Sequence, residues 1–126
     1  MSGVAFDANI LIDALAGFPP ALAELERVEE QGSRGWISRM TWIEVLSKGS
    51  PDVVIHAENF LSSFGIDELD AETAARAAAL RRDRPRLRSP DAVIFASAQL
   101  RGRILVTRNT RDFPATMPGI RVPYIL

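Results

Sequence analysis

The chain has 126 residues, 47% of them hydrophobic and 25% charged, which is the composition of a globular protein and excludes a disordered or fibrous one. Its 15 basic and 16 acidic side chains give a net charge of −1, so a polyanionic partner must be met by a local patch of positive charge. The absence of cysteine excludes disulfides and thiolate metal sites, and no apolar run approaches the roughly 20 residues that cross a bilayer. We therefore expect one cytoplasmic domain over residues 1–126, with no signal peptide and no membrane partner.

Short apolar runs, typical of buried strands, alternate along the chain with helical spacing of apolar residues. In residues 21–30, for example, Leu22, Leu25 and Val28 recur at three-residue spacing and predict an amphipathic helix. Strands separated by helices favour an α/β fold with a central, mostly parallel sheet flanked by helices on both faces. The predicted strands are 4–6, 36–37, 104–106 and an edge strand at 121–125, and residues 66–69 form either a strand or a turn. The first predicted helix begins near residue 10, and the others cover 21–30, 38–47, 52–63, 70–82 and 89–100.

Five acidic or amide side chains stand where predicted strands end or where helices begin. Asp7 directly follows the first strand, and Asn109 and Asp112 follow the fourth. Glu44 and Asp91 lie near the starts of two predicted helices. If the strands are parallel neighbours, right-handed crossovers bring all five positions to one edge of the sheet, where α/β folds bind ligands.

Each acid also has an ordinary structural explanation. Asp7 is placed to cap a helix, and Asp91 to stabilise the positive end of a helix dipole. Thr41 and Glu44 have the spacing of a capping box, in which Glu44 would bond only to the backbone of Thr41. Clustered together, however, such like charges repel one another and are tolerated chiefly around a cation. The lone histidine, His56, falls in the middle of a helix away from the acids, so we expect it to be a surface or helix-packing residue.

Oxygen ligands without histidine or cysteine favour a hard ion, Mg²⁺ or Mn²⁺, over zinc. Such ions suit phosphodiester hydrolysis because they acidify water and neutralise charge on the phosphate. We expect Asp7 and Asp91 to hold the ion directly, and Glu44 to hold it through water or to orient the attacking water. Asn9 and Thr107 are placed to aim those carboxylates.

Four motifs occur in the order and spacing of the PIN-domain nucleases, and the chain resembles in particular the VapC-type ribonuclease toxins of toxin–antitoxin pairs. The motifs are Asp7-Ala8-Asn9-Ile10-Leu11-Ile12, Thr41-x-x-Glu44-Val45-Leu46, Pro90-Asp91-Ala92-x-Ile94 and Val106-Thr107-Arg108-Asn109-x-x-Asp112-Phe113.

This resemblance implies a three-layer α/β/α fold and a Mg²⁺- or Mn²⁺-dependent endoribonuclease acting on transfer, ribosomal or messenger RNA. It also implies a homodimer and a small cognate antitoxin. Asp7, Glu44 and Asp91 match the acidic triad of the family, while the fourth ligand is either Asn109 or Asp112. We favour Asp112 as the fourth acid, with Asn109 holding the loop in shape.

A basic loop precedes the helix of Asp91, with five arginines between residues 81 and 88. Its alternatives are a solvated helix end and a track that binds RNA phosphates beside the metal. On the second interpretation, Arg84, Arg86 and Arg88 bind RNA, and Arg108 extends the track. No aromatic run accompanies these arginines, so we expect contacts to the RNA backbone and no base stacking.

Two other functional classes remain open. A phosphatase of the haloacid-dehalogenase kind also places an Asp after its first strand, but it needs a second acid two residues later, where this chain has Asn9. A catalytically silent PIN-like module would bind RNA or protein without cleaving it, against which the intact acids argue. The apolar faces expected on helices 21–30 and 52–64 suit a two-fold dimer interface and an antitoxin segment, or alternatively pack one core.

Overall fold

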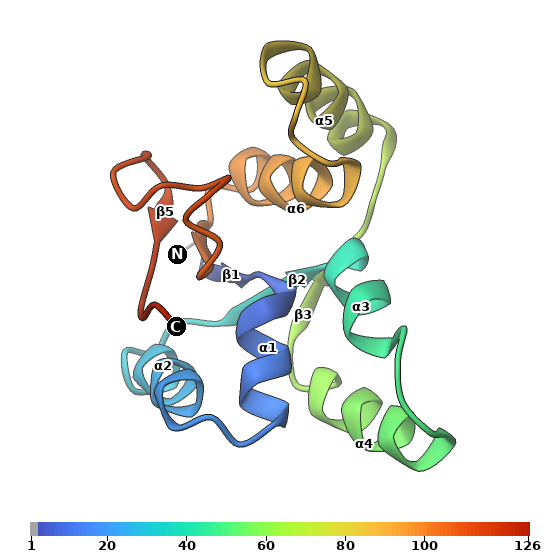
Figure 1. Ribbon diagram of the computed structural model, residues 1–126, viewed down its shortest axis with the longest axis vertical. Coiled ribbons are helices and arrows are strands. Elements are labelled where there is room, and N and C mark those ends of the chain that lie inside the picture. Colours follow the sequence, from blue (N-terminus) through green and yellow to red (C-terminus); the bar gives the residue numbers. More distant parts are fainter. Residues whose placement is uncertain (1–2) are drawn as a thin grey trace.

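The computed structural model describes residues 3–126, so the first two residues of the domain predicted for 1–126 lie outside the described range. Figure 1 shows how its elements alternate along the chain. They are β1 (Val4–Phe6), α1 (Ala8–Leu15), α2 (Pro19–Glu30), β2 (Gly35–Ser38), α3 (Arg39–Leu46), α4 (Pro51–Leu61), β3 (Gly65–Asp67), α5 (Ala71–Asp83), α6 (Ser89–Leu100), β4 (Ile104–Val106) and β5 (Ile120–Arg121).

The strands form one sheet in the order β3-β2-β1-β4-β5, and every neighbouring pair within residues 3–126 is parallel. In Figure 1, α5 and α6 lie on one side of the sheet and α1, α2 and α4 on the other. The predicted three-layer α/β/α class is therefore confirmed. Because the first strand lies at the centre, between β2 and β4, the residues that follow it lie in the middle of the sheet's carboxyl edge.

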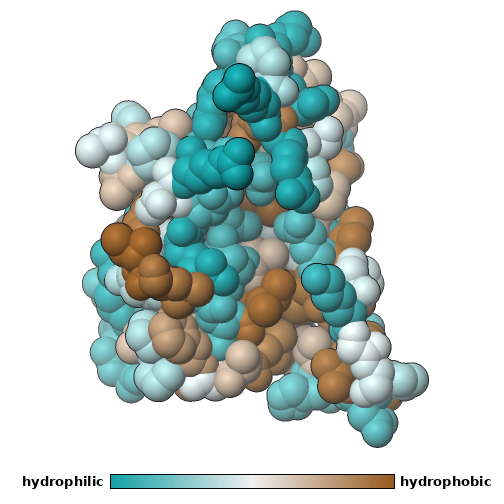
Figure 2. Space-filling view, in the orientation of Figure 1, coloured by the Kyte–Doolittle hydropathy of each residue, from teal (hydrophilic) through white to brown (hydrophobic). Residues whose placement is uncertain are grey.

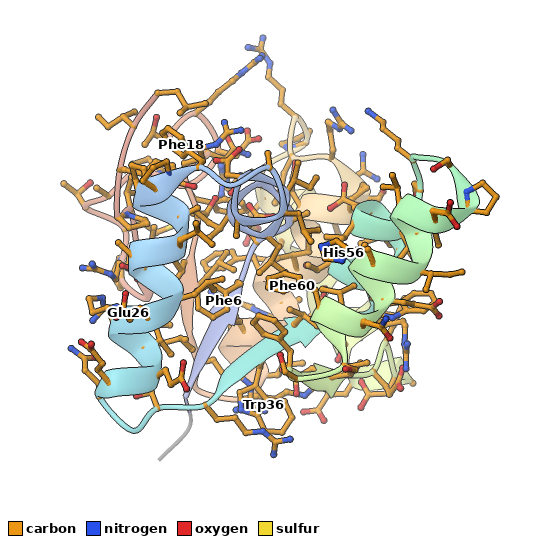
Figure 3. The ribbon with its side chains drawn as sticks, turned by 90° about the horizontal axis from the view of Figure 1, so that it is seen from below. Phe6, Phe18, Glu26, Trp36, His56 and Phe60 are labelled. Atoms are coloured by element: carbon orange, nitrogen blue, oxygen red, sulfur yellow. The ribbon has the colours of Figure 1, made fainter. Side chains whose placement is uncertain are left out.

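Alternation along the short strands divides the core between the two faces of the sheet. Ala5 and Leu105 pack with the cluster under α5 and α6, whereas Phe6 and Val106 pack with the cluster under α1, α2 and α4. Figure 3 shows Phe6 and Phe60 within this second layer, while Glu26 points away from α2. Each face of the sheet is therefore covered, as a parallel sheet requires.

The final strand is shorter than predicted. Only Ile120 and Arg121 pair with β4, and the predicted extension to residue 125 is wrong. Pro123 has no backbone N–H to give to a sheet ladder, and the Tyr124 side chain instead donates a hydrogen bond to Asp13 of α1. The C-terminal segment therefore leaves the sheet and crosses toward α1.

The buried face of α2 does not coincide with its apolar spacing. Leu22 is 45% exposed, whereas Glu24 is 4% exposed and faces inward together with Val28. Helical periodicity puts residues 21, 24 and 28 on one face, and an acid is tolerated there because Arg121 and Arg27 pair with it. Apolar spacing alone did not reveal this buried acid.

Within residues 3–126, no single helix is long and apolar enough to cross a membrane. The pair α1 and α2 passes by length and composition alone, with a bend of 112° between the helices.

Candidate active site

A cavity of about 1350 Å³ opens at the carboxyl edge of the central strands. It is walled by α1, α3, α4 and the loops that precede α6 and follow β4. Figure 2 shows hydrophilic surface running from the top of this face down to its centre. The lining contains the carboxylates of Asp7, Glu44, Asp91 and Asp112, the cations Lys48, Arg84, Arg86, Arg88, Arg108 and Arg111, and an aliphatic wall that includes Ile12, Leu15, Val45, Val53 and Ala57.

Asp7 is the most enclosed acid of the cavity, at 4% exposure. It is indeed the N-cap of α1, where its Oδ1 accepts from the backbone N–H of Ala8 at 2.8 Å. Its Oδ2 accepts from the Thr107 hydroxyl at 2.7 Å and from the Asn9 amide at 3.3 Å. Burial raises the pKa of Asp7 despite these bonds. Asp7 can therefore both cap α1 and serve in the site, because its hydrogen bonds hold in a fixed orientation a carboxylate that is poorly solvated by water.

Glu44 and Asp91 are half-buried and face the same cavity. Burial raises the pKa of Glu44, and the charges of Asp7 and Asp91 raise it further. Burial likewise raises the pKa of Asp91, followed by the charges of Asp7 and Asp112, while Arg88 lowers both pKa values. The four acids therefore lie close enough to repel one another.

The capping box considered as the alternative explanation for Glu44 does not form. The N-cap of α3 is Ser38, whose Oγ accepts from the backbone N–H of Thr41 at 3.0 Å. Since α3 begins three residues earlier than that motif requires, Glu44 lies beyond the first turn and has no backbone donor to bind. Its carboxylate has no hydrogen bond among residues 3–126 and stays available to a ligand.

The loop after β4 folds into one tight turn. The Asn109 carbonyl accepts from the backbone N–H of Phe113 at 2.9 Å, while its side-chain Oδ1 accepts from Asp112 N–H at 3.3 Å and its Nδ2 donates to Asp112 Oδ2 at 3.0 Å. The N–H of Asn109 in turn donates to the Thr107 hydroxyl oxygen at 3.0 Å. Asn109 is therefore occupied in shaping the turn, and Asp112 is the residue whose charge reaches Asp91.

The donor chemistry of these residues fits a hard divalent cation. All the candidate ligands are carboxylate oxygens, the charges of neighbouring acids raise the pKa of Glu44 and of Asp91, and a cation among them would relieve that repulsion. Among residues 3–126, no three acidic or histidine side chains converge closely enough to hold one ion together. Mg²⁺ does not need three, because it keeps several waters and takes one or two carboxylates with the phosphates of its substrate.

The arginines that we predicted to bind RNA fall into two groups. Arg86 and Arg88 are exposed at the mouth of the cavity. Arg84 instead donates to the backbone carbonyl of Asp112, and its guanidinium lies 5.9 Å from the ring centre of Phe113. Arg108 forms an ion pair with Asp13 of α1. The second group is thus engaged by protein, which the sequence did not reveal.

Three residues at or beside the cavity were missed or left unassigned. Lys48, the only lysine, is exposed at the mouth on the loop between α3 and α4. Asp13 accepts hydrogen bonds from both Arg108 and Tyr124 just behind the cavity. The spacing of Asn9 and Asp13, four residues apart on α1, was the signal available for Asp13. His56, by contrast, is exposed on α4, as predicted.

Comparison with known proteins supports the same fold. A toxin–antitoxin complex from Klebsiella pneumoniae contains a chain that is 37% identical, with a TM-score of 0.86 over 98% of this chain and 100% of that one. DNA-bound VapBC from Salmonella typhimurium is 27% identical, with a TM-score of 0.79 over 96% of each chain. VapBC2 from Rickettsia felis, bound to a promoter DNA fragment, is 20% identical, with a TM-score of 0.76 over 93% of this chain and 94% of that one.

No curated protein matches the chain. The family model of the PIN domain matches residues 4–116, which include all four acids of the cavity. The family inferred from the four motifs is thereby confirmed, and the chain belongs to the PIN domain family.

Proposed function

We propose that this protein is a Mg²⁺- or Mn²⁺-dependent endoribonuclease of the VapC type, formed by a single domain over residues 1–126. The observation that carries the proposal is the set of four mutually repelling carboxylates, Asp7, Glu44, Asp91 and Asp112, at one cavity of a PIN domain. Family membership and the likeness to a chain of the Klebsiella toxin–antitoxin complex support it.

When bound, the ion supplies Lewis acidity, which neutralises charge on the phosphate and acidifies water. Asp7 and Asp91 are the proposed direct ligands, and Asp112 the proposed fourth acid. Glu44, with no bond of its own among the described residues, is suited to orient the attacking water. The hydroxyl of Thr107 keeps Asp7 turned toward the cavity.

The proposed substrate is RNA, which binds through its phosphates. Lys48, Arg86, Arg88 and Arg111 are exposed around the acids on three separate loops, so phosphates on both sides of the cleaved bond meet positive charge. The net charge of −1 makes this local arrangement necessary, because the protein as a whole does not attract RNA.

The proposed partners are a cognate antitoxin and a second copy of the chain. Apolar side chains are exposed on two helices, with Leu22 on α2 at 45% and Val53 and Ile55 on α4 at 54% and 57%. Such groups suit burial against another chain. A dimeric mass in light scattering at tens of micromolar supports self-association, and a monomeric mass contradicts it. Growth arrest on expression, relieved by coexpression of the adjacent small open reading frame, is the corresponding test of the toxin.

A cleavage assay tests the enzymatic proposal. Wild-type protein is incubated with transfer RNA or total RNA in Mg²⁺, in Mn²⁺ and in EDTA, beside Asp7→Asn, Asp91→Asn and the control Asp83→Asn. Asp83 is exposed at the end of α5 and outside the cavity. We expect cleavage with either ion, none in EDTA, a loss of about a thousandfold in the two site variants, and no loss in the control.

A binding measurement accompanies this assay. Addition of Mn²⁺ should raise the melting temperature of wild type but not of Asp7→Asn, because an ion bound only by the folded state stabilises it. RNA binding without cleavage would instead indicate a silent PIN module. Release of phosphate from a monoester, with a phosphorylated Asp7, would indicate a phosphatase.

A further inference from the structure

Behind the cavity, two side chains from distant parts of the sequence bind the carboxylate of Asp13. Arg108 donates from Nε to Asp13 Oδ2 at 2.7 Å and from Nη2 to Asp13 Oδ1 at 3.3 Å. Tyr124 donates its hydroxyl to the same Oδ2 at 2.7 Å. Burial raises the pKa of Asp13, but the bonds from Arg108 and Tyr124 outweigh it and leave the pKa lowered. We call these three residues the Asp13 clasp.

The clasp joins α1 to the loop that shapes the acidic site. Asn9, one helical turn before Asp13, accepts the backbone N–H of Arg108 on its Oδ1 at 3.3 Å. The α1 helix thus holds Arg108 by both its backbone and its side chain. The residue before Arg108 is Thr107, whose hydroxyl donates to Asp7 Oδ2 at 2.7 Å. Only one residue, Thr107, therefore stands between Arg108 of the clasp and the Asp7 carboxylate of the site.

This geometry assigns a different part to Arg108 from the one expected from the sequence. Two nitrogens of its guanidinium are bound by Asp13, so much of its charge is neutralised before any RNA arrives. A fixed Arg108 also keeps residues 107–112 in place, and these carry both the Thr107 hydroxyl and the Asp112 carboxylate. The Arg108–Asp13 ion pair therefore affects the site chiefly by fixing the position of this loop.

We infer that Asp13 and Tyr124 are positioning residues of the nuclease, which act through Arg108 to hold the loop that orients Asp7. The inference rests on the proposed function for its kinetic readout but not for its structural one. It requires that loosening the clasp lower turnover and metal affinity while leaving RNA affinity nearly unchanged. An RNA-binding Arg108 requires the opposite pattern.

The chain offers a mild way of loosening the clasp. The ring of Tyr124 packs edge-on against Phe18, with ring centres 5.3 Å apart. Tyr124→Phe keeps that packing and removes only the hydroxyl that binds Asp13. Asp13→Asn removes the charge with little change of size, and Asp83→Asn is its matched control, because Asp83 is exposed and has no ion pair among the described residues.

The experiment compares wild type, Tyr124→Phe, Asp13→Asn, Arg108→Gln, Asp13→Asn/Arg108→Gln and Asp83→Asn. Four quantities are measured: kcat and KM on one RNA substrate, Mn²⁺ affinity by calorimetry, amide hydrogen exchange of residues 107–113, and melting temperature. We expect kcat to fall about tenfold in Asp13→Asn with KM within about twofold, weaker Mn²⁺ binding and faster exchange in that segment. Tyr124→Phe should show the same pattern to a smaller degree, and the double variant should be no worse than Arg108→Gln.

A rise in KM alone, or additive losses in the double variant, would overturn the inference in favour of direct RNA binding by Arg108. Unchanged exchange and Mn²⁺ affinity in both Asp13→Asn and Tyr124→Phe would also overturn it. If Asp13→Asn does not fold, the inference is tested by the kcat, Mn²⁺ affinity and hydrogen exchange of Tyr124→Phe alone. If wild type cleaves no RNA, the proposed function fails, yet hydrogen exchange and Mn²⁺ binding still show whether the clasp holds the loop.

Discussion

The buried carboxylate of Glu24 allows a quantitative test of how the C-terminal segment is attached. Arg121 of β5 donates to both of its oxygens, at 2.8 and 2.9 Å, and Arg27 donates to both from within α2, at 2.8 and 3.0 Å. Burial raises the pKa of Glu24, but these bonds outweigh it and lower the pKa from 4.5 to about 2. Glu24→Gln keeps the size of the side chain and removes the charge. Glu26→Gln, exposed on the same helix, is the control.

The lowered pKa sets both the size and the pH range of the effect. At about 1.4 kcal/mol per pKa unit, the charge of Glu24 contributes at most about 3.5 kcal/mol to the free energy of unfolding. Arg121 is 41% exposed, so water screens part of this, and we expect about 2 kcal/mol, or roughly 8 °C in melting temperature. Because the folded pKa is depressed, the contribution is complete above pH 4.5 and is lost as the pH falls toward about 2.

Urea unfolding of wild type and Glu24→Gln, followed by circular dichroism, measures this difference at neutral pH and at several acidic pH values. The difference in unfolding free energy should shrink steadily between pH 4.5 and about 2, while Glu26→Gln should match wild type throughout. A difference that stays constant over this range would refute the assignment to charge. It would indicate that Glu24 contributes through packing alone.

Two further predictions concern the cavity. Lys48→Ala and Arg86→Ala should each raise KM for RNA without changing kcat. Because each removes one phosphate contact, each should also reduce the slope of log affinity against log salt concentration by about 0.7. An unchanged salt dependence would show that the substituted residue does not contact the RNA phosphates. Asp112→Asn should lower both the cleavage rate and the Mn²⁺ affinity, whereas Asn109→Asp should retain or strengthen Mn²⁺ binding. If Asp112→Asn has no effect and Asn109→Ala is inactive, Asn109 is the fourth ligand and Asp112 shapes the loop.

The layers of the fold were predictable because they depend on local periodicity. Short apolar runs separated by helical patterns imply a parallel sheet, and that sheet is observed. The errors arose where a long-range contact overrides local pattern. Glu24 lies on the buried face of α2 because Arg121, 97 residues later, neutralises it. Nothing within α2 itself indicates that partner.

The site divides in the same way. Asp7 and Asp91 could be placed in one cavity because each stands next to a strand end or a helix start, and topology brings such positions together. Glu44 could be added because it lies on the short helix that directly follows β2. The turn that joins Asn109 to Asp112 was predictable from three-residue spacing. Asp13 was missed because its partners are 95 and 111 residues away, and only the folded structure brings Arg108 and Tyr124 to it.

The pairing of the arginines explains how a nearly neutral protein can offer positive charge to the proposed RNA substrate. Arg84 binds a backbone carbonyl, and Arg108 and Arg121 bind the carboxylates of Asp13 and Glu24. These three arginines therefore hold loops and strands together and contribute little to the outer field. Arg86 and Arg111, on separate loops, are exposed at the cavity mouth and have no ion pair among residues 3–126. Substitutions in the first group should therefore reduce stability or loop order, and those in the second should reduce RNA affinity alone. A net charge counted from the sequence cannot separate these groups, because it weighs every arginine equally whatever it binds.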